Sequence, residues 1–129
     1  MTVILDDGER LADLPRDAST AARVVRIDGY ADLRYYQHPL PALTEIGGSA
    51  FLRGYAHIPA WIGQVGEDER GFSFWADLTR HRIRGACYSF TPEQALAYWG
   101  PGGQSDRPDC LALAQKAIAL AERVTGDRS

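Results

Sequence analysis

Cysteine, lysine and long hydrophobic runs are scarce in this chain, and each scarcity excludes a class of protein. The two cysteines, Cys87 and Cys110, are too few and too far apart in sequence for a disulfide scaffold or a C-x-x-C metal site. No run of about 18 apolar residues occurs, so we expect no membrane span. The N-terminus reaches Asp6 after a short apolar stretch and lacks a basic segment, so we expect no signal peptide and a cytoplasmic location.

Basic residues do not outnumber acidic ones, and almost all of them are arginine. The formal net charge is −3, so nucleic acid and anionic membranes are not expected as partners. Thirteen arginines accompany a single lysine, Lys116, which indicates a GC-rich bacterial genome rather than a particular chemistry. The cluster Arg80–Arg84 is predicted to be a solvated strand face that pairs with acidic stretches.

The sequence between Pro59 and Phe90 contains the strongest strand signals. Three runs rich in aromatic and β-branched residues, 59–65, 71–77 and 82–90, are separated by polar or Gly-containing breaks. This pattern predicts an antiparallel meander.

An earlier segment, residues 23–37, predicts a β-hairpin. Asp28-Gly29 lies between two β-rich runs, and this dipeptide favours a type I′ turn because both central residues need positive φ. Alternation in the second run places Ala31, Leu33 and Tyr35 on the face expected to enter the core. Hairpin and meander together predict an antiparallel sheet of about five strands, whereas residues 1–22 and 42–58 allow no firm assignment.

Two helices are predicted to pack on this sheet. Thr91 is a suitable N-cap, Pro92 suits the first helical position, and Gln94 completes a capping box, so a helix should span 92–99. An amphipathic pattern predicts a longer helix over 108–124, with Gly126 as its stop. The chain of 129 residues, 45% of them hydrophobic, is therefore predicted to form a single α+β domain over residues 1–129.

Catalytic and metal-binding signals are weak. His38, His57 and His81 show no metal-ligand spacing, so no metal or cofactor is expected. His81 and Cys87 would share a strand face but lie roughly 20 Å apart, at about 3.3 Å per residue, so they cannot form a dyad. The weak catalytic candidates are therefore Asp77, His57, His81 and Cys87, and whether the chain is an enzyme stays open, with the balance toward no.

Aromatic residues exceed what one face of a small sheet can bury, and this surplus gives the main functional hypothesis. The chain would be a small non-catalytic interaction protein of the immunity, inhibitor or regulatory type, binding a protein partner or a second copy of itself. Tyrosine, tryptophan and arginine are the residue types expected at such an interface. The candidate binding residues on a sheet face are Arg34, Tyr36, Trp75, Arg82 and Arg84.

The alternative hypothesis is a small-molecule enzyme or ligand-binding protein with a pocket between a curved sheet and the helices. The pocket would be lined by Tyr55, Trp61, Trp75 and Trp99. Asp77, His57 or His81 would then supply acid–base chemistry.

Overall fold

A computed structural model describes residues 1–86 and 88–126 of the chain. It confirms the α+β class, with strands and two principal helices. The chain divides into two compact units, Met1–Pro59 (unit 1) and Ala60–Ser129 (unit 2). That residues 1–129 behave as a single domain stays a prediction. Among the described residues, no helix combines the length and apolar character that a membrane span needs.

The main sheet of unit 1 has four strands in the order β2-β1-β3-β5. Its elements are β1 (Thr2–Leu5), β2 (Arg10–Leu11), β3 (Val24–Asp28) and β5 (Glu45–Ile46). β3 pairs antiparallel with β1 and parallel with β5. The buried apolar side chains of this sheet include Val3, Leu5, Val24, Ile27 and Ile46.

The hairpin predicted over residues 23–37 is wrong. Gly29 does adopt a positive φ of 79°. After it, however, β4 (Ala31–Asp32) pairs in parallel with β6 (Ala50–Phe51) and forms a separate two-stranded sheet. The physical reason is that β1 and β5 occupy both edges of β3, which leaves no edge for the following strand. Strands are therefore distributed over three sheets rather than one.

The predicted core face of residues 31–35 is only partly correct. Ala31 and Leu33 are fully buried, but Tyr35 is 86% exposed. Strand alternation fails at Tyr35 because β4 ends at Asp32, whose carboxylate accepts a hydrogen bond from the backbone N–H of Arg34 (3.2 Å) and so starts a turn.

The segments that the sequence left unassigned contain short elements. Residues 1–22 include the two-residue β2 and a one-turn helix, α1 (Ala18–Ala21). Asp17 caps α1 by accepting a hydrogen bond from the N–H of Thr20. Residues 42–58 include β5 and β6, which pair with β3 and β4 respectively.

Unit 2 contains the predicted meander, a four-stranded antiparallel sheet in the order β10-β9-β8-β7. The strands are β7 (Ile62–Glu67), β8 (Ser73–Asp77), β9 (Arg82–Gly85) and β10 (Tyr88–Phe90). The sequence predicted three strands, and the fourth arises because the chain turns at Ala86, where φ is +50°. Cys87, a predicted candidate, lies outside the described residues.

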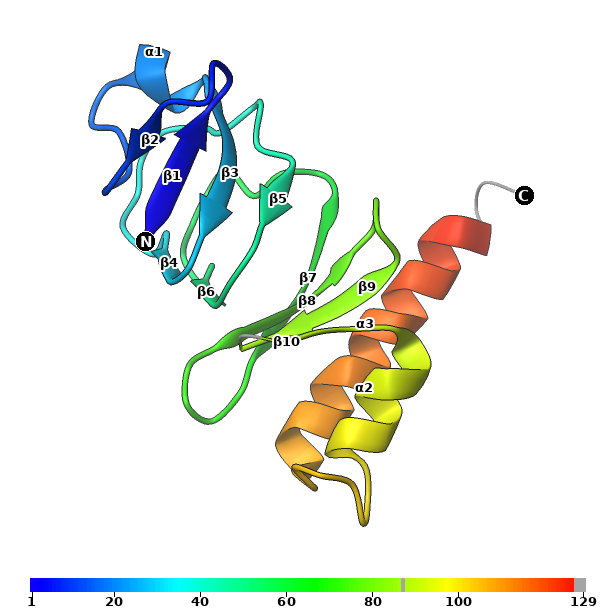
Figure 1. Ribbon diagram of the computed structural model, residues 1–129. Coiled ribbons are helices and arrows are strands. Elements are labelled where there is room, and N and C mark those ends of the chain that lie inside the picture. Colours follow the sequence, from blue (N-terminus) through cyan, green and yellow to red (C-terminus); the bar gives the residue numbers. More distant parts are fainter. Residues whose placement is uncertain (87, 127–129) are drawn as a thin grey trace. The chain divides into compact units, whose positions relative to one another are not determined.

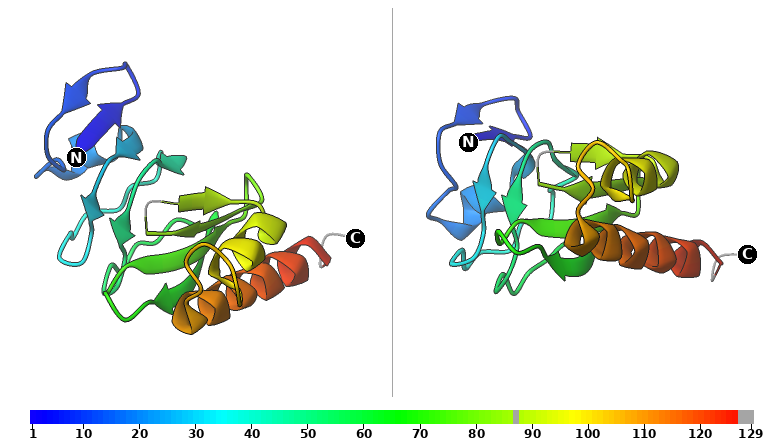
Figure 2. Two further views of the ribbon diagram at one scale, coloured as in Figure 1. Left: turned by 60° about the horizontal axis from the view of Figure 1, so that its bottom comes forward. Right: turned by 90° about the horizontal axis from the view of Figure 1, so that it is seen from below.

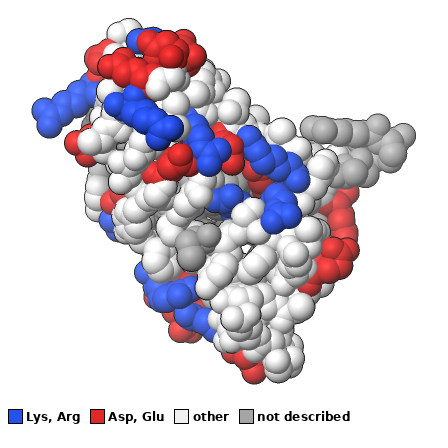
Figure 3. Space-filling model, viewed as in Figure 1, with Lys and Arg blue, Asp and Glu red and all other residues white. Residues whose placement is uncertain are grey.

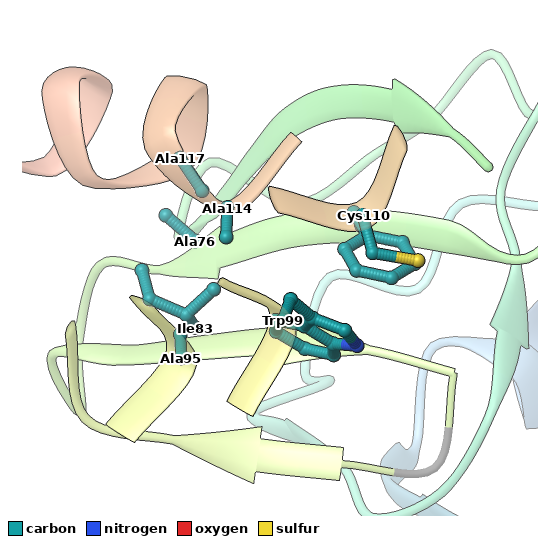
Figure 4. Packing of buried hydrophobic residues seen from close by; sticks show 8 residues of the cluster. Ala76, Ile83, Ala95, Trp99, Cys110, Ala114 and Ala117 are labelled. Carbon is teal, nitrogen blue, oxygen red and sulfur yellow. The ribbon is translucent and has the colours of Figure 1, made fainter. Parts of the chain in front are cut away.

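Two helices, α2 (Pro92–Trp99) and α3 (Pro108–Gly126), lie side by side on one face of this sheet (Figure 1; Figure 2). The capping box of Thr91 and Gln94 is present as predicted. Ala114 and Ala117 of α3 face Ala76 of β8 (Figure 4). These small side chains bring helix and sheet close together, and Trp99 fills the space between α2 and the sheet by packing on Phe74 (ring centroids 5.1 Å apart).

Candidate functional site

Unit 1 presents a group of aromatic rings around one arginine, which we call the Tyr–Arg surface: Tyr30, Arg34, Tyr35 and Phe51. Tyr35 is 86% exposed and Tyr30 49%, the two highest values among the described aromatic residues. Phe51 ends β6 and lies beneath the arginine. Large aromatic side chains are normally at least partly buried, so this surface is the most exposed aromatic feature of the described chain.

The guanidinium of Arg34 is fixed by Asp32. Its Nε donates to Asp32 Oδ1 (2.9 Å) and an Nη atom donates to Oδ2 (2.7 Å), the two-point geometry that arginine and carboxylate favour. The hydrogen bonds from Arg34 lower the pKa of Asp32, and the same pair raises the pKa of Arg34. Both side chains are partly exposed, so the pair orients Arg34 rather than contributing much stability.

Aromatic rings hold the same guanidinium on its other sides. The central carbon of Arg34 lies 4.9 Å from the Phe51 ring centroid and 5.8 Å from that of Tyr35. Tyr30 contacts Phe51 edge to face, with centroids 5.0 Å apart. Cation–π contacts and ring packing therefore order the surface before any partner arrives, which lowers the entropy cost of binding.

An open groove of about 420 Å³ adjoins the Tyr–Arg surface. Tyr36 lines it and is anchored, because its hydroxyl donates to the carbonyl of Pro15 (2.6 Å). The Tyr55 ring lies beside that of Tyr36 (centroids 6.4 Å apart); the Tyr55 hydroxyl donates to the carbonyl of His38 (2.7 Å), and burial raises the pKa of Tyr55 to about 12. His57 is exposed at the groove and meets the Tyr55 ring edge to face.

The structure brings together two of the five predicted binding residues, Arg34 and Tyr36, at this groove. The other three lie in unit 2. Trp75 and Arg84 are cross-strand partners, and the central carbon of the Arg84 guanidinium lies 5.5 Å from the Trp75 ring centroid. Both side chains are buried: Trp75 is 1% exposed and Arg84 is 9% exposed. Arg82 donates to the hydroxyl and carbonyl of Ser89, so it secures β10 to β9.

The tryptophans predicted to line one pocket do not share one. Trp99 packs on Phe74 at the helix side of the unit 2 sheet, whereas Trp75, the next residue after Phe74, points to the other side. Trp61 contacts Trp75 edge to face, with ring centroids 5.8 Å apart. Tyr55, the fourth predicted residue, belongs to unit 1.

Asp77 and His81 lie at the turn between β8 and β9. The Asp77 carboxylate accepts hydrogen bonds from the backbone N–H groups of Thr79 and Arg80 and from the Arg80 guanidinium (3.2 Å). His81 has a φ of +55° and lines an open groove of about 360 Å³ with Trp61. Asp77 thus organises the turn, and His81 is the exposed ionisable group of this groove.

A cluster of Asp68, Asp109 and Cys110, with ligand atoms within 4.8 Å of one another, has the residue types of a metal site. Each carboxylate already has a cation: Arg70 pairs with Asp68 (2.7 Å) and Arg107 with Asp109 (2.9 Å). Burial raises the pKa of the Cys110 thiol to about 11, which opposes the thiolate that metals prefer. The cluster instead joins the β7–β8 turn to the start of α3.

Sequence reasoning missed Tyr30, Tyr35 and Phe51 as parts of the Tyr–Arg surface. Strand alternation places Tyr35 in the core, and Phe51 lies in residues 42–58, for which the sequence allows no firm assignment. The available signal was Asp32 two residues before Arg34, a spacing at which aspartate often starts a turn and ends a strand.

Acidic and basic side chains adjoin one another in several patches of the face shown in Figure 3, and neither sign dominates it. Such a surface lacks the single-sign field that attracts polyanions.

Comparisons with protein-family models, with curated proteins and with solved structures find no match to this chain.

Proposed function

We propose that this chain is a small non-catalytic interaction protein, of the immunity, inhibitor or regulatory type, that binds a protein partner through the Tyr–Arg surface. The observation that carries the proposal is the 86% exposure of Tyr35 beside an arginine that Asp32 and Phe51 hold in place. Tyrosine and arginine dominate the binding energy of protein interfaces because both combine a large flat contact area with hydrogen-bonding groups.

The charge of this surface further defines the partner. Because Asp32 neutralises Arg34, the surface carries little net charge and should recognise a partner by shape, ring contacts and hydrogen bonds. The adjoining groove of about 420 Å³ would accept one projecting side chain or loop of that partner.

As part of the same proposal, we infer that the chain comes from a bacterium and is located in the cytoplasm. The arginine-to-lysine ratio of thirteen to one supports a GC-rich bacterial source. The buried, free thiol of Cys110 is ordinary in a reducing compartment.

Site-specific photo-crosslinking tests the proposal. The photoreactive amino acid p-benzoylphenylalanine replaces Tyr35 in one variant and Leu96 in a matched control, since Leu96 is an exposed residue of unit 2 (40%). Both variants are irradiated in lysate of a GC-rich bacterium. We expect one discrete protein to be attached at residue 35 and not at residue 96. Equal labelling at both positions, or none at residue 35, would contradict the assignment, and attachment to a second copy of this chain would identify the partner as itself.

A second candidate function is the binding of a small ligand at the Trp61–His81 groove. The observation that favours it is the positive φ of His81, since backbone strain in a non-glycine residue concentrates at functional sites. His81→Gly would relieve the strain while removing the imidazole. Under this alternative, a ligand found by changes in tryptophan fluorescence would bind the wild type and not the glycine variant.

A further inference from the structure

A second groove, on unit 2, lies between an edge strand and the C-terminal helix. β7 is the last strand in the order β10-β9-β8-β7 and pairs only with β8 among the described residues. The groove has a volume of about 330 Å³ and is lined by Gln64 and Val65 of β7 and by four residues of α3: Lys116, Ala119, Leu120 and Arg123.

The charged side chains that line this groove lie at its two ends. Lys116 and Arg123 mark its two ends along α3, and Ala119 and Leu120 lie between them. Seven residues of helix separate the two cations, which is about 10 Å along the axis at 1.5 Å per residue. The groove is therefore apolar in the middle and cationic at both ends.

Neither cation has an ion-pair partner among residues 1–86 and 88–126. The ion pairs of the described residues engage Arg23, Arg26, Arg34, Arg70, Arg80 and Arg107, and include neither Lys116 nor Arg123. Glu122, the residue before Arg123 in α3, does not line the groove. Within the described part of the chain, the charges of Lys116 and Arg123 therefore remain available to an acidic ligand.

We infer that this groove binds an extended acidic segment of a partner protein, with two carboxylates four residues apart and an apolar residue midway between them. In an extended chain, residues four apart lie on the same side and about 13 Å apart, which the long Lys116 and Arg123 side chains can span. The apolar residue then lies on Ala119 and Leu120. The outer edge of β7, which has no strand partner among the described residues, adds backbone hydrogen bonds to a chain in this conformation.

The shape of β7 limits how much backbone pairing contributes. The register of β7 on β8 shifts between Gln64 and Gly66, which marks a bulge. A bulge interrupts regular pairing along an edge, so the two charge contacts should supply most of the selectivity. The net charge of −3 disfavours a polyanion at the same site.

The probe that tests this site is the fluorescein-labelled peptide Thr-Glu-Thr-Val-Thr-Glu-Thr, measured by fluorescence anisotropy. We expect saturable binding that weakens at least about tenfold in the double variant Lys116→Gln/Arg123→Gln, as expected for two lost charge contacts. Arg10→Gln, an exposed arginine of unit 1, is the matched charge control and should leave the affinity unchanged. Circular dichroism checks that the variants retain their helices.

Two further ligands distinguish specific binding at this groove from a general attraction of the protein to anions. A peptide of the same composition with its two glutamates adjacent should bind at least about tenfold more weakly, and a thymidine 15-mer should not compete. Absence of saturable binding up to about 1 mM, binding unchanged in the double variant, or equal binding of the adjacent-glutamate peptide or the oligonucleotide would each overturn the inference. The Tyr–Arg surface is intact in every variant, so failure here leaves the proposed function untouched.

Discussion

At the level of single residues, an aspartate–arginine ion pair has a different role at Asp32 than at Asp68. Asp32 fixes Arg34 at the surface and thereby orders groups that a partner can contact. Asp68 is buried, and its carboxylate accepts hydrogen bonds from the N–H groups of Arg70 and Phe72 as well as from the Arg70 guanidinium. The first pair prepares a surface, whereas the second closes a turn.

The Cys110 thiol should be unreactive at neutral pH. Its pKa is raised to about 11 because burial disfavours the thiolate, so the folded state binds this proton more tightly than the unfolded state does. The resulting stability is complete below the ordinary thiol pKa and is lost as pH rises toward 11. In a Cys87→Ser variant, which leaves Cys110 as the only thiol, alkylation by iodoacetamide at pH 8 should be at least about 100-fold slower than in denaturant. Comparable rates would mean that Cys110 is accessible.

At the level of elements, local signals predicted unit 2 well. The meander and both helices depend on residues close in sequence, such as Thr91, Pro92 and Gln94, whose capping box the structure contains. The hairpin of unit 1 failed for a long-range reason, since Asp28-Gly29 sets a turn but cannot choose the strand that pairs next. Arg34 and Tyr36 of the candidate site were predicted, whereas Tyr35 was not, because its exposure depends on where β4 ends.

Removal of the α2 cap should have a measurable cost. Thr91 accepts the N–H of Gln94, and Gln94 in turn accepts the N–H of Thr91. Thr91→Ala should therefore lower the free energy of unfolding by about 1 kcal/mol in urea titrations. Thr79→Ala, at an exposed turn position, should change it by less than about 0.5 kcal/mol. Equal effects of the two substitutions would show that the cap contributes nothing specific.

Two glycines of the unit 2 sheet should tolerate alanine to different degrees. A Cβ at Gly85 would meet the Phe74 ring at 2.4 Å, and this ring is fixed in the core against Trp99. A Cβ at Gly63 would come closest to the end of the Leu120 side chain, at 2.6 Å, which can move, and would otherwise meet Ala76 at ordinary contact distances of 3.4 and 3.5 Å. Thermal unfolding should show a loss of about 1–3 kcal/mol for Gly85→Ala and a smaller loss for Gly63→Ala. The reverse order would contradict this packing.

At the level of the whole molecule, the prediction of a single domain leads to a calorimetric test. One cooperative transition should describe the unfolding of all 129 residues. Gly85→Ala in unit 2 and Gly48→Ala in unit 1, where a Cβ would lie 2.0 Å from the carbonyl oxygen of Gly29, should lower the same midpoint. Two transitions, each shifted by only one of these variants, would instead show that the units unfold as separate domains.

Binding of a partner through the Tyr–Arg surface can be tested by measuring affinity. The protein crosslinked at residue 35 is purified, and its dissociation constant is measured for wild type, Arg34→Ala, Tyr35→Ala and the control Leu96→Ala. Tyrosine and arginine at the centre of an interface typically contribute more than about 1.4 kcal/mol, which is tenfold in affinity. The predicted result is binding at least about tenfold weaker for both Tyr–Arg surface variants and unchanged binding for Leu96→Ala. Wild-type affinity in both surface variants would show that the Tyr–Arg surface does not bind the partner.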